Sequence, residues 1–165
     1  MLLGPVACKR HQQQTKEEAT DEQGQTLMPM IHVADQRAAV QLVKGFYDVE
    51  QNAWRWTMKK FSVTLRPPEG AAKNGAVLQM KFSVPDPVIE KLKSVTLSAT
   101  IKGVALPRET YTKPGEYVLT REVPAKAFQS DAVTVDFALD KAMAPTEADL
   151  RELGIVVSTV GLERK

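Results

Sequence analysis

The chain has 165 residues, of which 43% are apolar, 25% are charged and only 6% are aromatic. This length is enough for one domain with a hydrophobic core and a modest tail, and it excludes two large domains. Lys and Arg number 22 against 20 Asp and Glu. The net charge of +2 therefore gives no electrostatic reason to expect a nucleic-acid partner.

The chemically versatile side chains are confined to the N-terminal part of the sequence. The single cysteine is Cys8 and the two histidines are His11 and His32, so residues 41–165 contain neither type. Ser-His-Asp and Cys-His nucleophilic sites need an imidazole, and zinc sites rely mainly on Cys and His. We therefore predict a non-enzymatic protein without a metal or cofactor, and a glycosidase built on two carboxylates is a remote alternative.

Residues 1–8, MLLGPVAC, form a short apolar stretch that ends in small residues before Cys8. The stretch resembles the end of a bacterial lipoprotein signal peptide, in which the cysteine becomes the lipidated first residue of the mature chain. Pro5 departs from that pattern, as does the lack of a basic n-region. The resemblance implies lipidation at Cys8 and a periplasmic or surface location in the cell envelope. If it is accidental, residues 1–8 are an ordinary N-terminus of a cytoplasmic protein.

Residues 9–40 begin with a polar stretch, KRHQQQTKEEATDEQGQ, which has no aromatic side chain. Such a composition cannot bury enough apolar surface to fold. We therefore predict a polar linker over residues 9–40 and a folded domain over residues 41–165. Because no run of 18 apolar residues occurs, contact with a membrane is expected only through a lipid on Cys8.

From residue 41 onward, apolar and polar side chains alternate with the period of half-buried strands. The predicted strands cover residues 41–47, 61–65, 76–84, 95–102, 117–123, 133–139 and 155–162. A chain reversal is expected at Gly103, a short helix over 86–93 and a single helical turn over 124–128. Seven or eight short strands separated by Pro and Gly turns predict an all-β fold, an antiparallel β-sandwich of jelly-roll type.

Both tryptophans lie in the segment GFYDVEQNAWRWT at residues 45–57. On a strand, Trp54 and Trp56 share one face and Arg55 lies on the other. Aromatic rings stack on the apolar faces of sugars, and Glu50 and Arg55 are suited to bind sugar hydroxyls. The structural alternative is that one or both tryptophans pack in the core.

A second candidate segment is DLRELG at residues 149–154, directly before the last predicted strand. Asp149 and Arg151 alternate with Leu150, so one can pair with the other or with Glu50 if the strands adjoin. A structural ion pair that fixes this turn is the alternative to a role in ligand binding.

Three motifs together resemble a poorly characterised class of bacterial β-sandwich modules: GFYxxE at 45–50, WRWT at 54–57 and DxRxLG at 149–154. These modules are similar to galactose-binding-like jelly rolls and occur in envelope and surface-polysaccharide contexts. The resemblance covers residues 45–162 and implies the same fold and a link to carbohydrate. It carries over no catalytic residue. The positions that match recurrent ones are Glu50, Trp54, Trp56, Asp149 and Arg151.

These observations predict a cell-envelope lipoprotein whose sandwich binds a glycan. The candidate binding residues are Glu50, Trp54, Arg55, Trp56, Asp149 and Arg151. The alternative is a structural or assembly module that contacts another envelope protein through a sheet face or edge. The outward row Thr96, Ser98 and Thr100 motivates this alternative, because it is small and polar and lacks the charges that block edge pairing.

Overall fold

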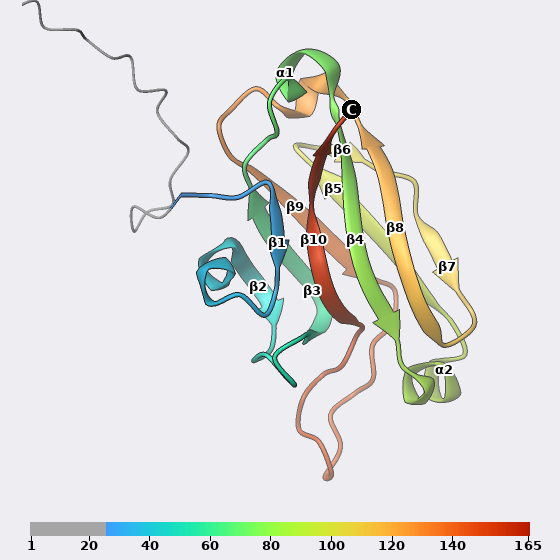
Figure 1. Ribbon diagram of the computed structural model, residues 1–165. Coiled ribbons are helices and arrows are strands. Elements are labelled where there is room, and N and C mark those ends of the chain that lie inside the picture. The colour runs from blue at the N-terminus through green and yellow to red at the C-terminus, as the bar shows by residue number, and fades with distance from the viewer. Residues whose placement is uncertain (1–25) are drawn as a thin grey trace, which may run out of the picture.

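The structure, a computed structural model, describes residues 26–165, which form two packed layers of antiparallel strands with a few short helical segments (Figure 1). The proposed signal over residues 1–8 and its Cys8 lie outside the described residues. The strands are β1 (Met30–His32), β2 (Leu42–Phe46), β3 (Arg55–Leu65), β4 (Ala76–Val84), β5 (Val95–Ile101), β6 (Val104–Ala105), β7 (Glu109–Tyr111), β8 (Gly115–Val123), β9 (Val133–Leu139) and β10 (Val156–Arg164). The helical segments are the 3₁₀-helices η1 (Gln36–Gln41) and η2 (Ala125–Ala127) and the α-helices α1 (Ala71–Asn74) and α2 (Asp86–Leu92).

One layer has the strand order β1-β10-β4-β8, and the other has the order β2-β3-β9-β5, with β6 and β7 both paired to the far side of β5. The long strand β3 joins the layers, because Arg55 and Trp56 at its start pair with β10 while its second half pairs with β9. With β2 and β6 set aside, the order β1-β10-β4-β8 over β3-β9-β5-β7 is that of a jelly roll. The predicted all-β antiparallel sandwich is confirmed.

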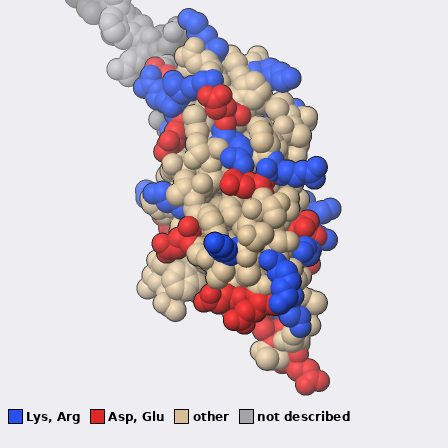
Figure 2. Space-filling view, turned by 90° about the vertical axis from the view of Figure 1, so that its right-hand side faces the viewer, with Lys and Arg blue, Asp and Glu red and all other residues tan. Residues whose placement is uncertain are grey.

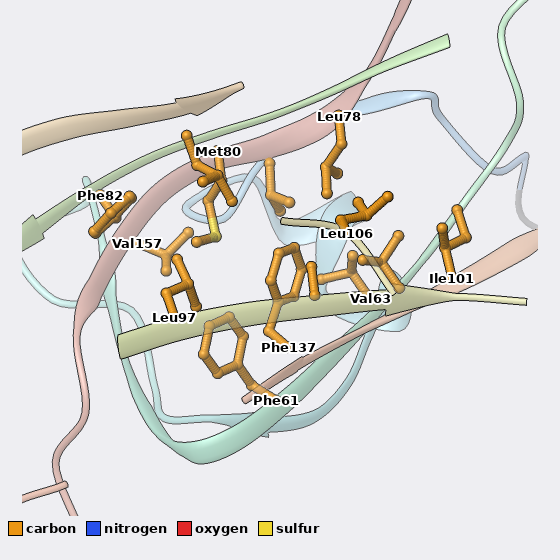
Figure 3. Close-up of a cluster of buried hydrophobic side chains, with 14 of the residues drawn as sticks. Phe61, Val63, Leu78, Met80, Phe82, Leu97, Ile101, Leu106, Phe137 and Val157 are labelled. Carbon is orange, nitrogen blue, oxygen red and sulfur yellow. The ribbon is translucent and has the colours of Figure 1, made fainter. Parts of the chain in front are cut away.

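The core lies between the two layers, where the inward side chains of each strand alternate with outward polar ones. Figure 3 shows side chains of β4, such as Met80, pointing toward Phe61 of β3 and Phe137 of β9. The rings of Phe61 and Phe137 stack with centroids 5.0 Å apart, and Phe46 meets Phe61 edge-on at 5.4 Å. Strand alternation therefore buries a continuous apolar layer without any long helix. No helix in residues 26–165 has the length and apolar character needed to cross a membrane.

The turns follow from local sequence. Lys102 and Gly103 both have positive φ, 48° and 76°, and they close the β5–β6 hairpin where the reversal was predicted. The short helix α2 starts immediately after Pro85, which occupies the N-cap position. Asp86 lies in the first turn, where its negative charge faces the positive end of the helix.

The folded domain begins earlier than the predicted boundary at residue 41. Ile31, Val33 and Ala38 are fully buried, Leu27 is 3% exposed, and β1 is hydrogen-bonded to β10. Residues 27–40 are therefore part of the sandwich rather than of the predicted linker. The three-residue strand β1 is too short to show an alternating pattern, which explains why the sequence did not mark it.

The chain enters and leaves the sandwich at the same end. Met30, at the start of β1, lies opposite Gly161, near the end of β10. The opposite end carries the turn between β2 and β3 and the long loop between β9 and β10 (Figure 1). The predicted site residues lie mainly at this second end.

Candidate functional site

The hairpin between β2 and β3 ends in a three-residue turn, and Glu50 and Trp54 lie opposite each other on either side of it. The Glu50 backbone N–H donates to the Trp54 carbonyl at 2.8 Å, and the reciprocal bond is 3.3 Å long. Gln51 and Asn52 in the turn have φ near +50°, a conformation that Asn tolerates better than most residues. Residues directly opposite in an antiparallel pair place their side chains on the same face, so the Glu50 carboxylate and the Trp54 indole share one face of the hairpin.

The β9–β10 loop, residues 140–155, is braced by its own hydrogen bonds. Met143 and Leu153 exchange backbone hydrogen bonds of 2.8 and 3.0 Å across the loop. Near its tip, the Thr146 N–H donates to the Asp149 carbonyl at 2.7 Å, and the Asp149 N–H donates to the Thr146 hydroxyl at 3.2 Å. The Leu150 side chain is 82% exposed. The loop therefore holds Asp149 and Arg151 in a defined geometry and leaves Leu150 in solvent.

Arg151 joins this loop to the hairpin. Its Nε and Nη2 donate to the two carboxylate oxygens of Asp149 at 3.0 and 2.9 Å, and its Nη1 donates to Oε1 of Glu50 at 3.0 Å. The guanidinium also lies over the ring of Tyr47, 5.3 Å from its centroid. The pairing expected from the sequence between Asp149, Arg151 and Glu50 is present, and it connects residues 101 positions apart.

The two partners of the bidentate pair stabilise each other's charge. Hydrogen bonds from the Arg151 side chain and backbone N–H hold the pKa of Asp149 below its ordinary value. The hydrogen bond to Asp149, followed by the one to Glu50, raises the pKa of Arg151 above its ordinary value. Both groups therefore stay ionised across the neutral pH range.

The side chains of Arg55 and Trp56 contact neighbouring parts of the sandwich. Arg55 was predicted to bind ligand beside the tryptophans, but its Nε donates to the Val33 carbonyl at 2.8 Å and its Nη1 to the Tyr47 carbonyl at 3.1 Å. Its guanidinium thereby ties the hairpin to the end of β1. Trp56 is half-buried and packs against the hydrophobic core, whereas Trp54 is half-buried outside the core cluster of the described residues.

The structure thus brings Glu50, Trp54, Asp149 and Arg151 together at one end of the sandwich. It adds Tyr47, which sequence reasoning did not single out, although it belongs to the GFYxxE motif. The position of its ring under a distant arginine has no local sequence signal. Among residues 26–165, no group of three or more His, Cys, Asp and Glu side chains is arranged to hold a metal ion.

The row Thr96, Ser98 and Thr100, which motivated the assembly alternative, lies on β5 between β9 and the pair β6 and β7. It is therefore part of a sheet face and not of an edge. The Thr96 hydroxyl pairs with that of Thr110 at 2.7 Å, and the Ser98 hydroxyl donates to the Ala138 carbonyl at 3.3 Å. Neighbouring strands thus already engage two of the three hydroxyls.

No protein-family model and no curated protein matches this chain. Among solved structures, an acetyl xylan esterase (Est2A) from the rumen bacterium Butyrivibrio proteoclasticus is similar at a TM-score of 0.46 and 8% identity, over 84% of this chain and 32% of the esterase. This chain therefore spans about a third of the esterase's length.

Two carbohydrate-binding modules are also similar in structure. The CBM36-1 domain of a multidomain xylanase from the hindgut metagenome of Trinervitermes trinervoides gives a TM-score of 0.40 at 11% identity, over 74% of this chain and 87% of the domain. A CBM4 structure gives a TM-score of 0.35 at 9% identity, over 82% of this chain and 85% of that one. These likenesses are distant, and nothing about function is drawn from them.

Proposed function

We propose that the protein is a non-catalytic binding module whose ligand is a carbohydrate, bound at the end of the sandwich that carries the hairpin and the β9–β10 loop. One observation carries the proposal: the Trp54 indole shares a face of the hairpin with the Glu50 carboxylate, which Arg151 holds in place. An indole offers an apolar platform for a pyranose ring. A fixed carboxylate next to it is a strong acceptor for sugar hydroxyls.

The geometry of the site favours binding because its parts are already ordered. Arg151 fixes the carboxylates of Glu50 and Asp149, and Arg55 fixes the backbone at Tyr47. A ligand then loses less free energy to the ordering of side chains when it binds. The ion pairs of Arg151 with Glu50 and Asp149 are thus compatible with a binding role, because they fix the two carboxylates in position.

The same contacts favour binding over glycoside hydrolysis. A glycosidase needs one carboxylic acid that carries a proton near neutral pH. Here Glu50 and Asp149 both bind the guanidinium of Arg151, and this contact lowers the pKa of Asp149 rather than raising it. The two carboxylates are therefore arranged as hydrogen-bond acceptors.

We further propose that the module acts in the bacterial cell envelope, anchored by a lipid on Cys8. The sequence of residues 1–8 supports this location, as described above. Incorporation of a labelled fatty acid into the wild-type protein, and its loss in a Cys8→Ser variant, is the expected result. A wild-type protein that takes up no label would contradict the anchor without bearing on the glycan site.

Calorimetric titration against cell-wall and capsular oligosaccharides tests the binding proposal. Trp54→Ala should weaken binding at least tenfold while the folded state is retained. Trp56→Ala removes a side chain that packs on the core and should lower the free energy of unfolding by about 2 kcal/mol. Val118→Ala is the control and should leave both binding and stability nearly unchanged. Val118 is 55% exposed on β8, the edge strand of the layer β1-β10-β4-β8. If no oligosaccharide binds the wild type, or if Trp54→Ala binds normally, the proposal fails.

A further inference from the structure

We propose that the carbohydrate bound at this site carries a free, protonated amino group, so that the ligand class is a glycan containing unacetylated hexosamine. This inference rests on the proposed function and specifies the chemistry of the same site. Three features carry it: a carboxylate oxygen without a hydrogen bond among the described residues, an aromatic side chain on the same face of the hairpin, and the sign of the surrounding charge.

The first feature is the carboxylate of Glu50. Arg151 binds Oε1 at 3.0 Å, whereas Oε2 accepts no hydrogen bond from any residue in the described part of the chain. The Glu50 side chain is 38% exposed, so the carboxylate is accessible to a ligand. A carboxylate oxygen forms its strongest hydrogen bonds with charged donors such as an ammonium group.

The second feature is the pair of aromatic rings on the hairpin. The guanidinium of Arg151 already lies 5.3 Å from the centroid of the Tyr47 ring. Trp54 stands opposite Glu50, and an indole attracts a cation more strongly than a phenol ring does. A carboxylate and an indole on one face suit an ammonium group and disfavour the carboxylate of a uronic acid.

The third feature is the local charge. Residues 47–56 and 146–152 carry five acidic side chains and two basic ones, although the whole chain has a net charge of +2. The acidic side chains are Asp48, Glu50, Glu147, Asp149 and Glu152, and the basic ones are Arg55 and Arg151. Figure 2 views the β8 side of the molecule, where acidic and basic side chains are interspersed, and shows an acidic side chain at the lower tip, the end that carries the β9–β10 loop.

Neither arginine of residues 47–56 and 146–152 has an unmatched charge to offer to an anion. Arg151 is bound by two carboxylates, and Arg55 donates to two backbone carbonyls. A negatively charged sugar beside Glu50 and Asp149 would therefore meet carboxylates whose neighbouring arginines are already engaged. This repulsion discriminates between glycan classes as effectively as an added contact does.

The test compares three oligosaccharides of equal length by calorimetric titration at pH 6. The probes are the β-1,4-linked glucosamine hexamer, its fully N-acetylated counterpart and a galacturonate hexamer. We expect the glucosamine hexamer to bind at least tenfold more tightly than the N-acetylated one and the galacturonate hexamer to bind most weakly. Raising the ionic strength should shrink the first difference, because salt screens exposed charges.

Glu50→Gln should reduce the preference for the amino sugar to less than threefold while binding of the N-acetylated hexamer persists. Glu147→Gln, which removes an equal charge from the exposed loop, should keep most of the preference, and thermal unfolding of both variants checks that they fold. Equal binding of the amino and N-acetylated hexamers, or tighter binding of galacturonate, would overturn this inference and leave the glycan-binding proposal standing. Failure of all three hexamers and of the wider oligosaccharide panel would overturn both.

Discussion

Gln41 is the buried polar residue that secures the first described segment to the sandwich, and its replacement by leucine should destabilise the protein strongly. The side chain is 1% exposed. Its Nε2 donates to the carbonyls of Met28 and Thr64 at 3.0 and 2.9 Å, and its Oε1 accepts from the Met28 N–H at 3.1 Å. Leucine has a similar volume but no polar atoms, so the substitution removes all three bonds and leaves little empty space.

The size of the effect follows from these three bonds. A protein hydrogen bond contributes about 0.5–1.5 kcal/mol net, and a buried group left without a partner costs about 1–3 kcal/mol. Burying an apolar side chain in place of an amide recovers part of that loss. We therefore expect Gln41→Leu to lower the free energy of unfolding by about 2–4 kcal/mol, which is a large fraction of the roughly 5–15 kcal/mol typical of a domain.

Urea denaturation followed by fluorescence measures this change, and we expect the midpoint to fall by about 1–2 M. Gln36→Leu, at an exposed position of the same 3₁₀-helix, is the matched control and should change stability by less than about 0.5 kcal/mol. Amide hydrogen exchange at Met28 should accelerate in Gln41→Leu alone. Equal midpoints for the two variants would refute the role assigned to Gln41.

Two further predictions concern the backbone and the ion pair. Gly45→Ala should lower the free energy of unfolding by about 3 kcal/mol or more, because φ is +79° and an added Cβ would collide with the backbone of β3. Gly103→Ala, at φ +76° in open space, should lower it by only about 1–2 kcal/mol. Thermal unfolding of both variants measures the difference, and similar losses of stability would refute the steric argument. Because the pKa of Asp149 is lowered in the folded state, its stabilising effect is present above the unfolded pKa of about 3.9 and is lost as the pH falls through the lower folded value. Asp149→Asn should therefore lose less stability than the wild type between pH 5 and pH 2 in urea titrations, and equal acid sensitivity would contradict the pairing with Arg151.

Three strands with an alternating pattern over seven residues or more could be predicted to within one residue. The predicted ranges 76–84 and 133–139 coincide with β4 and β9, and 95–102 exceeds β5 by one residue. In each of these strands every second residue is buried against the other sheet, so the pattern reflects the packing directly. The three-residue strands β1 and β7 carry no such pattern, because their pairing depends on β10 and β5.

The candidate site could be predicted as a set of residues but not as a geometry. Glu50, Trp54, Asp149 and Arg151 do meet, although Glu50 and Arg151 are 101 residues apart and only the jelly-roll topology brings them together. The partners of Arg55 are backbone carbonyls, which every residue possesses, so no side-chain pattern can indicate them. Sequence reasoning therefore finds the reactive groups more readily than it finds their neighbours.

The pairing of β1 with β10 places the start of β1 and the end of β10 at the same end of the sandwich. Because the described chain enters β1 and leaves β10 at the end opposite the hairpin and the β9–β10 loop, a segment attached there starts from the end of the sandwich that does not carry Trp54. A lipid on Cys8, as proposed, would then be connected to the sandwich through the end that does not carry the binding residues. For the same reason, coupling to a sensor surface through either terminus should leave the binding end accessible to oligosaccharides.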